Sequence, residues 1–174
     1  MADPPEGIVL RRHRDLDGRG RQVWFRRGVL ALIAVVPVLG LLNVFGQRPS
    51  ETQASGPAAT LSLSAPERVR GGLLFQAHFT IRAQSELQKA ALVLHPDWLE
   101  GLTLNTLEPS PAEETSVNGA LRLDFGQIPA GQRFDVFLEY QVNPTSVGER
   151  KQWVDLVDGE TTVASIKRGL FIFP

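Results

Sequence analysis

Cysteine is missing from this sequence of 174 residues. Its absence excludes disulfides, thiol catalysis, lipoprotein acylation and cysteine-based zinc sites. A domain folded outside the cytoplasm would therefore be stabilised by its hydrophobic core rather than by covalent cross-links. The balance of residue types is that of a globular protein, because 43% are hydrophobic and 21% are charged.

Motifs for catalysis are also missing. The sequence has no G-x-S-x-G nucleophile turn and no glycine-rich phosphate loop. Its formal net charge is −1, which gives no reason to expect a nucleic-acid partner. We therefore predict that the protein is not an enzyme, uses no cofactor and has no small-molecule substrate.

Histidine is rare as well, with three residues in the chain. His78 and His95 fall in predicted strands, and a metal site would need a further ligand near both. The sequence favours ordinary surface histidines and no metal site.

Glu108, Glu113 and Glu114 lie in the segment "LEPSPAEETS". Paired carboxylates perform acid–base chemistry only inside a cleft, so the prediction here is a charged surface loop.

Charge is absent from one long stretch. Gly28–Gln47 is an uncharged run of 20 residues. As a helix rising about 1.5 Å per residue it would cover roughly 30 Å, the thickness of a bilayer's hydrocarbon core. Trp24 and Phe25 precede the run, where aromatic residues commonly contact lipid headgroups. The pattern predicts a transmembrane helix over residues 23–46, kinked at Pro37.

The arginines set the expected orientation of this span. Residues 1–27 carry seven arginines and four acidic residues, a net charge of +3, whereas Arg48 alone closely follows the run. Because positive charge stays inside, the N-terminus is predicted to be cytoplasmic and the C-terminal domain extracytoplasmic, in a single-pass protein of the cell membrane. A cleaved signal peptide is the alternative. Signal runs are shorter, typically about 7–15 residues, and Thr52-Gln53-Ala54 makes a weak cleavage site.

Changes in composition divide the remaining chain. Residues 1–22 are predicted to be an arginine-rich cytoplasmic tail. Residues 47–59, "QRPSETQASGPAA", have no hydrophobic pattern and are predicted to be a flexible linker. From residue 60 every second residue tends to be apolar, as in strands with one buried face.

Seven or eight short strands without a helix predict an Ig-like antiparallel β-sandwich over residues 60–174. Turn residues such as Asp158-Gly159 separate the strands. The expected strands are 60–64, 72–83, 89–95, 102–107, 120–126, 132–142, 151–157 and 161–172.

One segment carries a resemblance to a known family. "FGQIPAGQRFDVFLEYQV" resembles the late strand–turn–strand of bacterial Ig-like modules, including CARDB-type adhesion-related domains. The order of a basic tail, one span and a small β domain ending in "RGLFIFP" is similar to that of actinobacterial single-pass membrane proteins. The resemblance implies a fold and a location but no activity, because such sandwiches host many functions.

Two aromatic residues fall on the polar side of their predicted strands. Phe137 shares a face with Asp135, and Trp153 shares a face with Asp155. If their strands are neighbours, the two rings form an exposed apolar patch of the kind that marks a partner site. The alternative is that a loop or a further strand covers them.

Together these features predict a non-catalytic, membrane-anchored, extracytoplasmic Ig-like domain. The lipid bilayer holds its span, and tethering near the bilayer favours binding to another envelope or membrane protein. Phe137 and Trp153 are the predicted partner contacts.

Two other functions stay open. One is a carbohydrate- or ion-binding envelope module, for which Trp98 beside Asp97 and Glu100 is the candidate. The other is an accessory subunit of a multi-pass membrane complex. In that case Pro37, Gly40 and Asn43 would pack against neighbouring helices.

Overall fold

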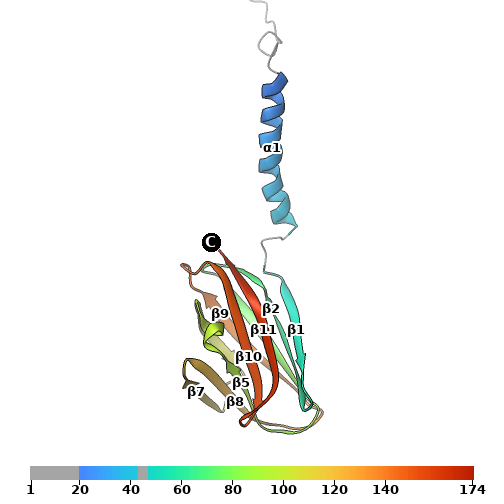
Figure 1. Cartoon of the computed structure of the whole chain (residues 1–174), viewed down its shortest axis with the longest axis vertical. Coiled ribbons are helices and arrows are strands. Elements are labelled where there is room, and N and C mark those ends of the chain that lie inside the picture. Colours follow the sequence, from blue (N-terminus) through green and yellow to red (C-terminus); the bar gives the residue numbers. More distant parts are fainter. Residues whose placement is uncertain (1–19, 43–46) are drawn as a thin grey trace, which may run out of the picture. The chain divides into compact units, whose positions relative to one another are not determined.

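The computed structural model describes residues 20–42 and 47–174, which belong to two separate units of the chain (Figure 1). The first unit contains the helix α1, Gly20–Leu41, and the second is a β-sandwich. None of the side chains of α1 is buried. The helix is long and apolar enough to cross a membrane, a property that N-terminal signal sequences share.

Helix α1 begins three residues before the predicted span and includes Pro37 in one continuous element. A proline inside a membrane helix is tolerated because neighbouring groups can satisfy the freed carbonyl. Gly40 also lies within α1. Asn43, the third predicted packing residue, falls outside the described residues.

The sandwich consists of two sheets with strand orders β1-β2-β4-β9-β6 and β3-β11-β10-β5-β8-β7. Neighbouring strands are antiparallel except for β3 and β11, which are parallel. A short helix, α2 (Pro96–Leu99), lies between β5 and β6. The strands are β1 (Pro49–Ser55), β2 (Ala59–Pro66), β3 (Arg68–Arg70), β4 (Leu74–Ala83), β5 (Leu87–Leu94), β6 (Leu102–Glu108), β7 (Glu113–Val117), β8 (Ala120–Ile128), β9 (Arg133–Val142), β10 (Gly148–Asp158) and β11 (Thr161–Phe173).

The mainly β sandwich fold and all eight expected strands are confirmed. Three further strands, β1, β3 and β7, were not expected from the sequence. The predicted linker 47–59 is wrong over Pro49–Ser55, because these residues form β1 and pair with β2 along their whole length. Backbone hydrogen bonds to a neighbouring strand outweigh a composition that by itself favours a flexible chain.

The core lies between the sheets and follows from the alternation. Leu61 and Leu63 of β2, Phe79 and Ile81 of β4, and Leu156 of β10 are among the residues with no exposed surface. All the buried hydrophobic residues of the described chain lie between Ala59 and Ile172, so the sandwich contains its own complete core. Each large side chain buried this way contributes about 1.5–3 kcal/mol.

Trp98 of α2 belongs to this core. It is 1% exposed, its ring lies 5.6 Å from that of Phe79, and its Nε1 donates a hydrogen bond of 2.9 Å to the hydroxyl of Tyr140. The sequence left Trp98 open as a core residue or an exposed contact, and the structure places it in the core, so its indole has no surface to offer the ligand of a carbohydrate-binding module. The same burial raises the pKa of the Tyr140 hydroxyl.

The bond between Trp98 and Tyr140 generates a stability prediction. In Tyr140→Phe the indole N–H stays buried without an acceptor, so we expect the free energy of unfolding to fall by about 1–3 kcal/mol. Urea unfolding of the fragment 45–174 measures the loss. Trp98→Phe in both backgrounds completes a double-mutant cycle. Additive losses would show that the bond does not couple the two residues.

Candidate functional site

The outer face of the five-stranded sheet carries a group of polar and aromatic side chains that we name the His78 cluster. It comprises His78, Thr80, Arg133, Asp135 and Phe137. The first two come from β4 and the others from β9, and these strands are neighbours. Their register places His78 opposite Phe137 and Thr80 opposite Asp135. Because residues between them, such as Phe79, point into the core, the cluster faces outward.

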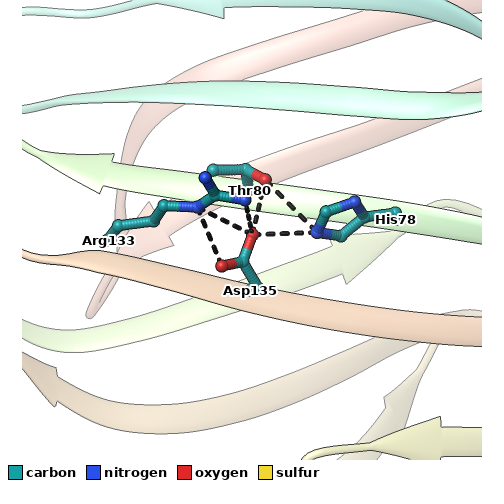
Figure 2. A network of polar contacts seen from close by, with 4 residues as sticks. All are labelled: His78, Thr80, Arg133 and Asp135. Atoms are coloured by element: carbon teal, nitrogen blue, oxygen red, sulfur yellow. Dashed lines mark hydrogen bonds and ion pairs between the residues drawn. The ribbon is translucent and has the colours of Figure 1, made fainter.

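Asp135 is the hub of the His78 cluster (Figure 2). Its Oδ1 accepts hydrogen bonds from the Thr80 hydroxyl at 2.7 Å and from Arg133 Nη2 at 2.8 Å. His78 Nε2 lies 2.8 Å from the same oxygen, and Arg133 Nε donates to Oδ2 at 2.8 Å. The imidazole of His78 also stacks on the ring of Phe137, with centroids 4.3 Å apart and planes inclined by 13°. Each side chain of the cluster is thus positioned by a hydrogen bond or a ring contact with at least one other member.

These contacts fix the charge of Asp135. The hydrogen bond from Arg133, followed by those from Thr80 and His78, lowers the pKa of its carboxyl group far below the usual range, against the opposing effect of burial. The side chains of His78 and Asp135 are 28% and 30% exposed, so the network is open to solvent. A charged and already ordered hydrogen-bonding group at a surface can contact a partner without a further loss of side-chain entropy.

Two surface hollows adjoin the cluster and share Ser64 and His78. One, of about 260 Å³, extends toward Glu51, Thr80 and Arg133, and the other, of about 330 Å³, extends toward Pro49 and Gln76. Serines on the outward side of β2 leave this space because their side chains are short. The two hollows adjoin at Ser64 and His78, and we name them together the polar groove. Its lining residues are Gln47, Pro49, Glu51, Ser62, Leu63, Ser64, Pro66, Phe75, Gln76, His78, Thr80, Arg82 and Arg133.

The other sheet carries a second group, the His95 cluster, made of His95, Trp153, Asp155, Ser165 and Lys167. His95 Nε2 lies 2.8 Å from Asp155 Oδ2. Asp155 Oδ1 accepts hydrogen bonds from the Ser165 hydroxyl at 2.5 Å and from Trp153 Nε1 at 2.8 Å. Burial opposes ionisation of Asp155, but the hydrogen bonds from Ser165, His95 and Trp153 outweigh it and lower the pKa of the carboxyl group.

Trp153 is enclosed by its neighbours in this cluster. His95 stacks on the indole with ring centroids 3.8 Å apart and planes inclined by 7°, and Lys167 Nζ lies 3.9 Å from the ring centroid. Strand β10 lies between β5 and β11, so the two residues cover opposite faces of the ring. What Trp153 presents to a partner is therefore mainly its edge.

Neither cluster has the geometry of a catalytic triad. In a triad the carboxylate and the nucleophile bind different nitrogens of the histidine. Asp135 lies at Nε2 of His78, and Thr80 faces that same nitrogen at 3.4 Å while donating its own proton to Asp135. Ser165 likewise donates to Asp155. In both clusters the hydroxyl stabilises the carboxylate.

The structure separates the residues that the sequence predicted would act together. Phe137 lies on β9 and Trp153 on β10, which belong to different sheets and face outward on opposite sides of the sandwich. The expectation of one shared apolar patch is wrong, because it assumed that the two strands are neighbours. The role of each residue as a partner contact stays a prediction.

The two histidines are separated for the same reason. After β4 the chain passes to the other sheet, so His78 and His95 do not lie on paired strands. Among the described residues there is no group of three histidine and acidic side chains placed to hold a metal ion. Thr80, Arg133, Ser165 and Lys167 were not predicted as site residues, because cross-strand register, which places them, is not visible in a single strand's sequence.

Comparisons with known proteins find only distant structural likeness. No known family model matches the sequence, and no curated protein sequence matches it. A non-cellulosomal cohesin from Archaeoglobus fulgidus is 11% identical with a TM-score of 0.42, over 73% of this chain and 92% of that one. CaCohA2 from Clostridium acetobutylicum is 14% identical with a TM-score of 0.44, over 64% and 88%. The human F-spondin reeler domain is 15% identical with a TM-score of 0.43, over 76% and 98%.

These neighbours are cohesin and reeler domains rather than CARDB-type domains. The resemblance to CARDB-type modules therefore stays a prediction.

The network around Asp135 predicts a pH-dependent stability. Its folded-state pKa is below the unfolded value of about 3.9, so its stabilisation is present above that pH and is lost as the pH falls toward the folded-state pKa. We expect Asp135→Asn to be less stable than the wild type at pH 7 and the difference to narrow below about pH 4. Thermal unfolding between pH 2 and pH 7 measures it. For Asp97→Asn, an exposed control on α2, we expect a smaller difference throughout. A difference in stability between the wild type and Asp135→Asn that stays the same from pH 7 to pH 2 would contradict the stabilising role of the ionised carboxylate.

Proposed function

We propose that this protein is a membrane-anchored, extracytoplasmic and non-catalytic binding domain. Its partner, another envelope or membrane protein, would contact the outer face of the five-stranded sheet. The observation that carries the proposal is the ordered His78 cluster beside a polar groove, on a face that no other element of the described sandwich covers. Preorganised side chains lower the entropy cost of association, and the partly exposed ring of Phe137 supplies contact area.

The chemistry of this face suits a polypeptide partner. Serine hydroxyls of β2, the His78 imidazole and the Arg133 guanidinium provide donors and acceptors along the groove, with Phe137 beside them. Such a mixture of hydrogen-bonding groups around an aromatic residue is typical of protein interfaces. The His95 cluster is less suited, since both faces of its indole are occupied within the domain.

Membrane anchorage is supported by α1 and by the charges around it. The helix has the length and apolarity of a span, and arginines are concentrated before it. Positive charge on that side favours a cytoplasmic N-terminus and an extracytoplasmic sandwich. A role as accessory subunit of a multi-pass complex is compatible with the same helix, because Pro37 and Gly40 are small or kink-prone residues that allow close packing in membranes.

Cross-linking at single cysteines tests the proposed binding face. The chain has no native cysteine, so Ser64→Cys in the groove and Lys151→Cys on the outer face of the other sheet can each carry a photo-activated cross-linker. In intact cells we expect a cross-linked adduct at position 64 and little at position 151. Adding Phe137→Arg to the Ser64→Cys protein should reduce the adduct several-fold, because a charged chain replaces the ring. Equal adducts at 64 and 151 would refute the assignment of the face.

Cysteine labelling also tests the topology. In intact cells, a membrane-impermeant maleimide should label Glu160→Cys in the sandwich and leave Ala2→Cys in the N-terminal tail unlabelled until the cells are opened. The full-length chain should stay in the membrane fraction after a carbonate wash. A shortened chain in the culture fluid would identify the apolar segment as a cleaved signal peptide instead.

A further inference from the structure

The exposed apolar residues of the sandwich are unevenly distributed. In the described part of the sandwich, five large apolar side chains are exposed, and they are Leu73, Leu74, Val117, Val147 and Phe171. Each of them is at least 42% exposed. All except Val117 lie at a single end of the domain. Scattered apolar residues need no explanation, but a group at one end does.

This end, which we name the Pro49 end, is the one at which β1 begins. There Pro49 pairs with the last residue of β2, Leu74 begins β4, and Gly148 pairs with Ile172 near the end of β11. Figure 1 shows the start of β1 and the C-terminal end of β11 at the same end of the sandwich.

Loops 70–74 and 143–148 belong to this end together. The amide of Gly71 donates to Phe173 O at 2.9 Å and that of Gly72 donates to Val142 O at 3.0 Å. Leu73 therefore lies in a loop that is hydrogen-bonded to both sheets, Leu74 follows it as the first residue of β4, and Val147 lies in the loop after β9.

The polypeptide enters the sandwich at the Pro49 end, directly after the apolar run. That run ends at Gln47, and β1 begins at Pro49, so Arg48 alone separates the last uncharged residue from the first strand. Two residues of extended chain reach about 7 Å. Even counted from Leu41, the last residue of α1, the eight residue steps to Pro49 reach at most about 29 Å. A sandwich anchored by this run cannot move its Pro49 end far from the bilayer surface.

The charges at this end suit a lipid surface. The guanidinium groups of Arg48, Arg68 and Arg70 are exposed there, and Arg70 Nε donates to Pro174 O at 3.1 Å. Two carboxylates, Glu67 and Glu149, are exposed nearby, and Glu67 accepts a hydrogen bond from Ser50. Arg150 Nε and Glu100 Oε1 lie 3.7 Å apart at the same end, where the amide of Asn143 donates to Gly101 O. Acidic and basic side chains are therefore mixed there, and individual arginines rather than a net positive charge are suited to contact lipid phosphates.

We propose that the Pro49 end of the sandwich docks on the bilayer surface. Leu73, Leu74 and Val147 lie among the lipid headgroups, and Arg68 and Arg70 contact lipid phosphates. The proposal rests on the membrane anchorage proposed above. Docking would fix the orientation of the domain on the membrane. The outer faces of both sheets, including the His78 cluster, would then lie perpendicular to the bilayer plane, where partners in the same membrane can reach them. Burial of apolar loops in the headgroup layer, combined with basic side chains, is a known way of holding a protein surface on lipid.

Environment-sensitive fluorophores on single cysteines test the docking. The full-length chain is placed in nanodiscs of phosphatidylcholine and phosphatidylglycerol, with the probe at Leu73→Cys, Val147→Cys or, at the opposite end, Glu160→Cys. We expect emission at positions 73 and 147 to shift to shorter wavelength and to be quenched by lipids spin-labelled at headgroup depth. The probe at 160 should keep its aqueous emission. Aqueous emission at all three positions would overturn the proposal.

A matched pair of variants separates docking from a local effect of the probe. With the probe at position 147, Leu73→Asp plus Leu74→Asp should abolish the blue shift. Val117→Asp, which changes an equally exposed apolar residue elsewhere, should leave the shift unchanged. All three residues are exposed, so the melting temperature should hardly change in either variant. An unchanged shift in the double variant would count against docking.

Further experiments distinguish lipid from protein as the binding partner of the Pro49 end and test membrane anchorage by α1 separately. Arg68→Glu plus Arg70→Glu, or discs of phosphatidylcholine alone, should weaken the shift at position 147. Protection in native membranes but not in nanodiscs would mean that a protein covers this end, which would overturn the lipid proposal. A probe at Val35→Cys in α1 reports anchorage by itself, through quenching by lipids labelled in the acyl chain. If that probe is quenched while position 73 stays aqueous, docking fails and anchorage stands.

Discussion

The packing of two apolar sheet faces against each other is the interaction on which this domain depends. With no cysteine in the chain, no disulfide can share that task. The buried residues run from Ala59 to Ile172 and come from both sheets, and α1 adds none. Because strands alternate their side chains, filling this core also decides which residues face outward. The packing of the core therefore also determines which side chains make up the outer surfaces of the sandwich.

Both histidine clusters follow from that constraint. Each is built from residues one position away from core residues: Thr80 follows Phe79, and Asp155 follows Val154. Cross-strand register then brings an imidazole, a carboxylate, a hydroxyl and an aromatic ring together on each outer face. The clusters differ in one respect that matters for binding. The His78 cluster lies beside an open groove, whereas the His95 cluster encloses its own tryptophan.

The start of β1 limits the length of chain between the apolar run and the sandwich, which matters for the proposed membrane anchorage. A flexible linker would let the sandwich sample many positions above the bilayer, with a high but diffuse local concentration. Because ordered strand begins at Pro49, almost no free chain follows the uncharged run. A short connection restricts the orientations that the domain can adopt. In the membrane-anchored arrangement that we propose, such a restriction would favour partners in the same membrane over partners that diffuse freely.

The sequence alone determined the apolar helix, the eight main strands and the outward direction of Phe137 and Trp153, because each depends on the local spacing of apolar residues. It did not determine which strands are neighbours. That is why a shared patch of Phe137 and Trp153 was expected although the two residues lie on opposite faces, and why the sequence left open whether Trp98 is exposed or, as found, buried beside Tyr140. Strand β1 was missed because its polar residues gain order from hydrogen bonds to β2. Pairing between distant segments is decided by the whole core, and only the tertiary structure contains it.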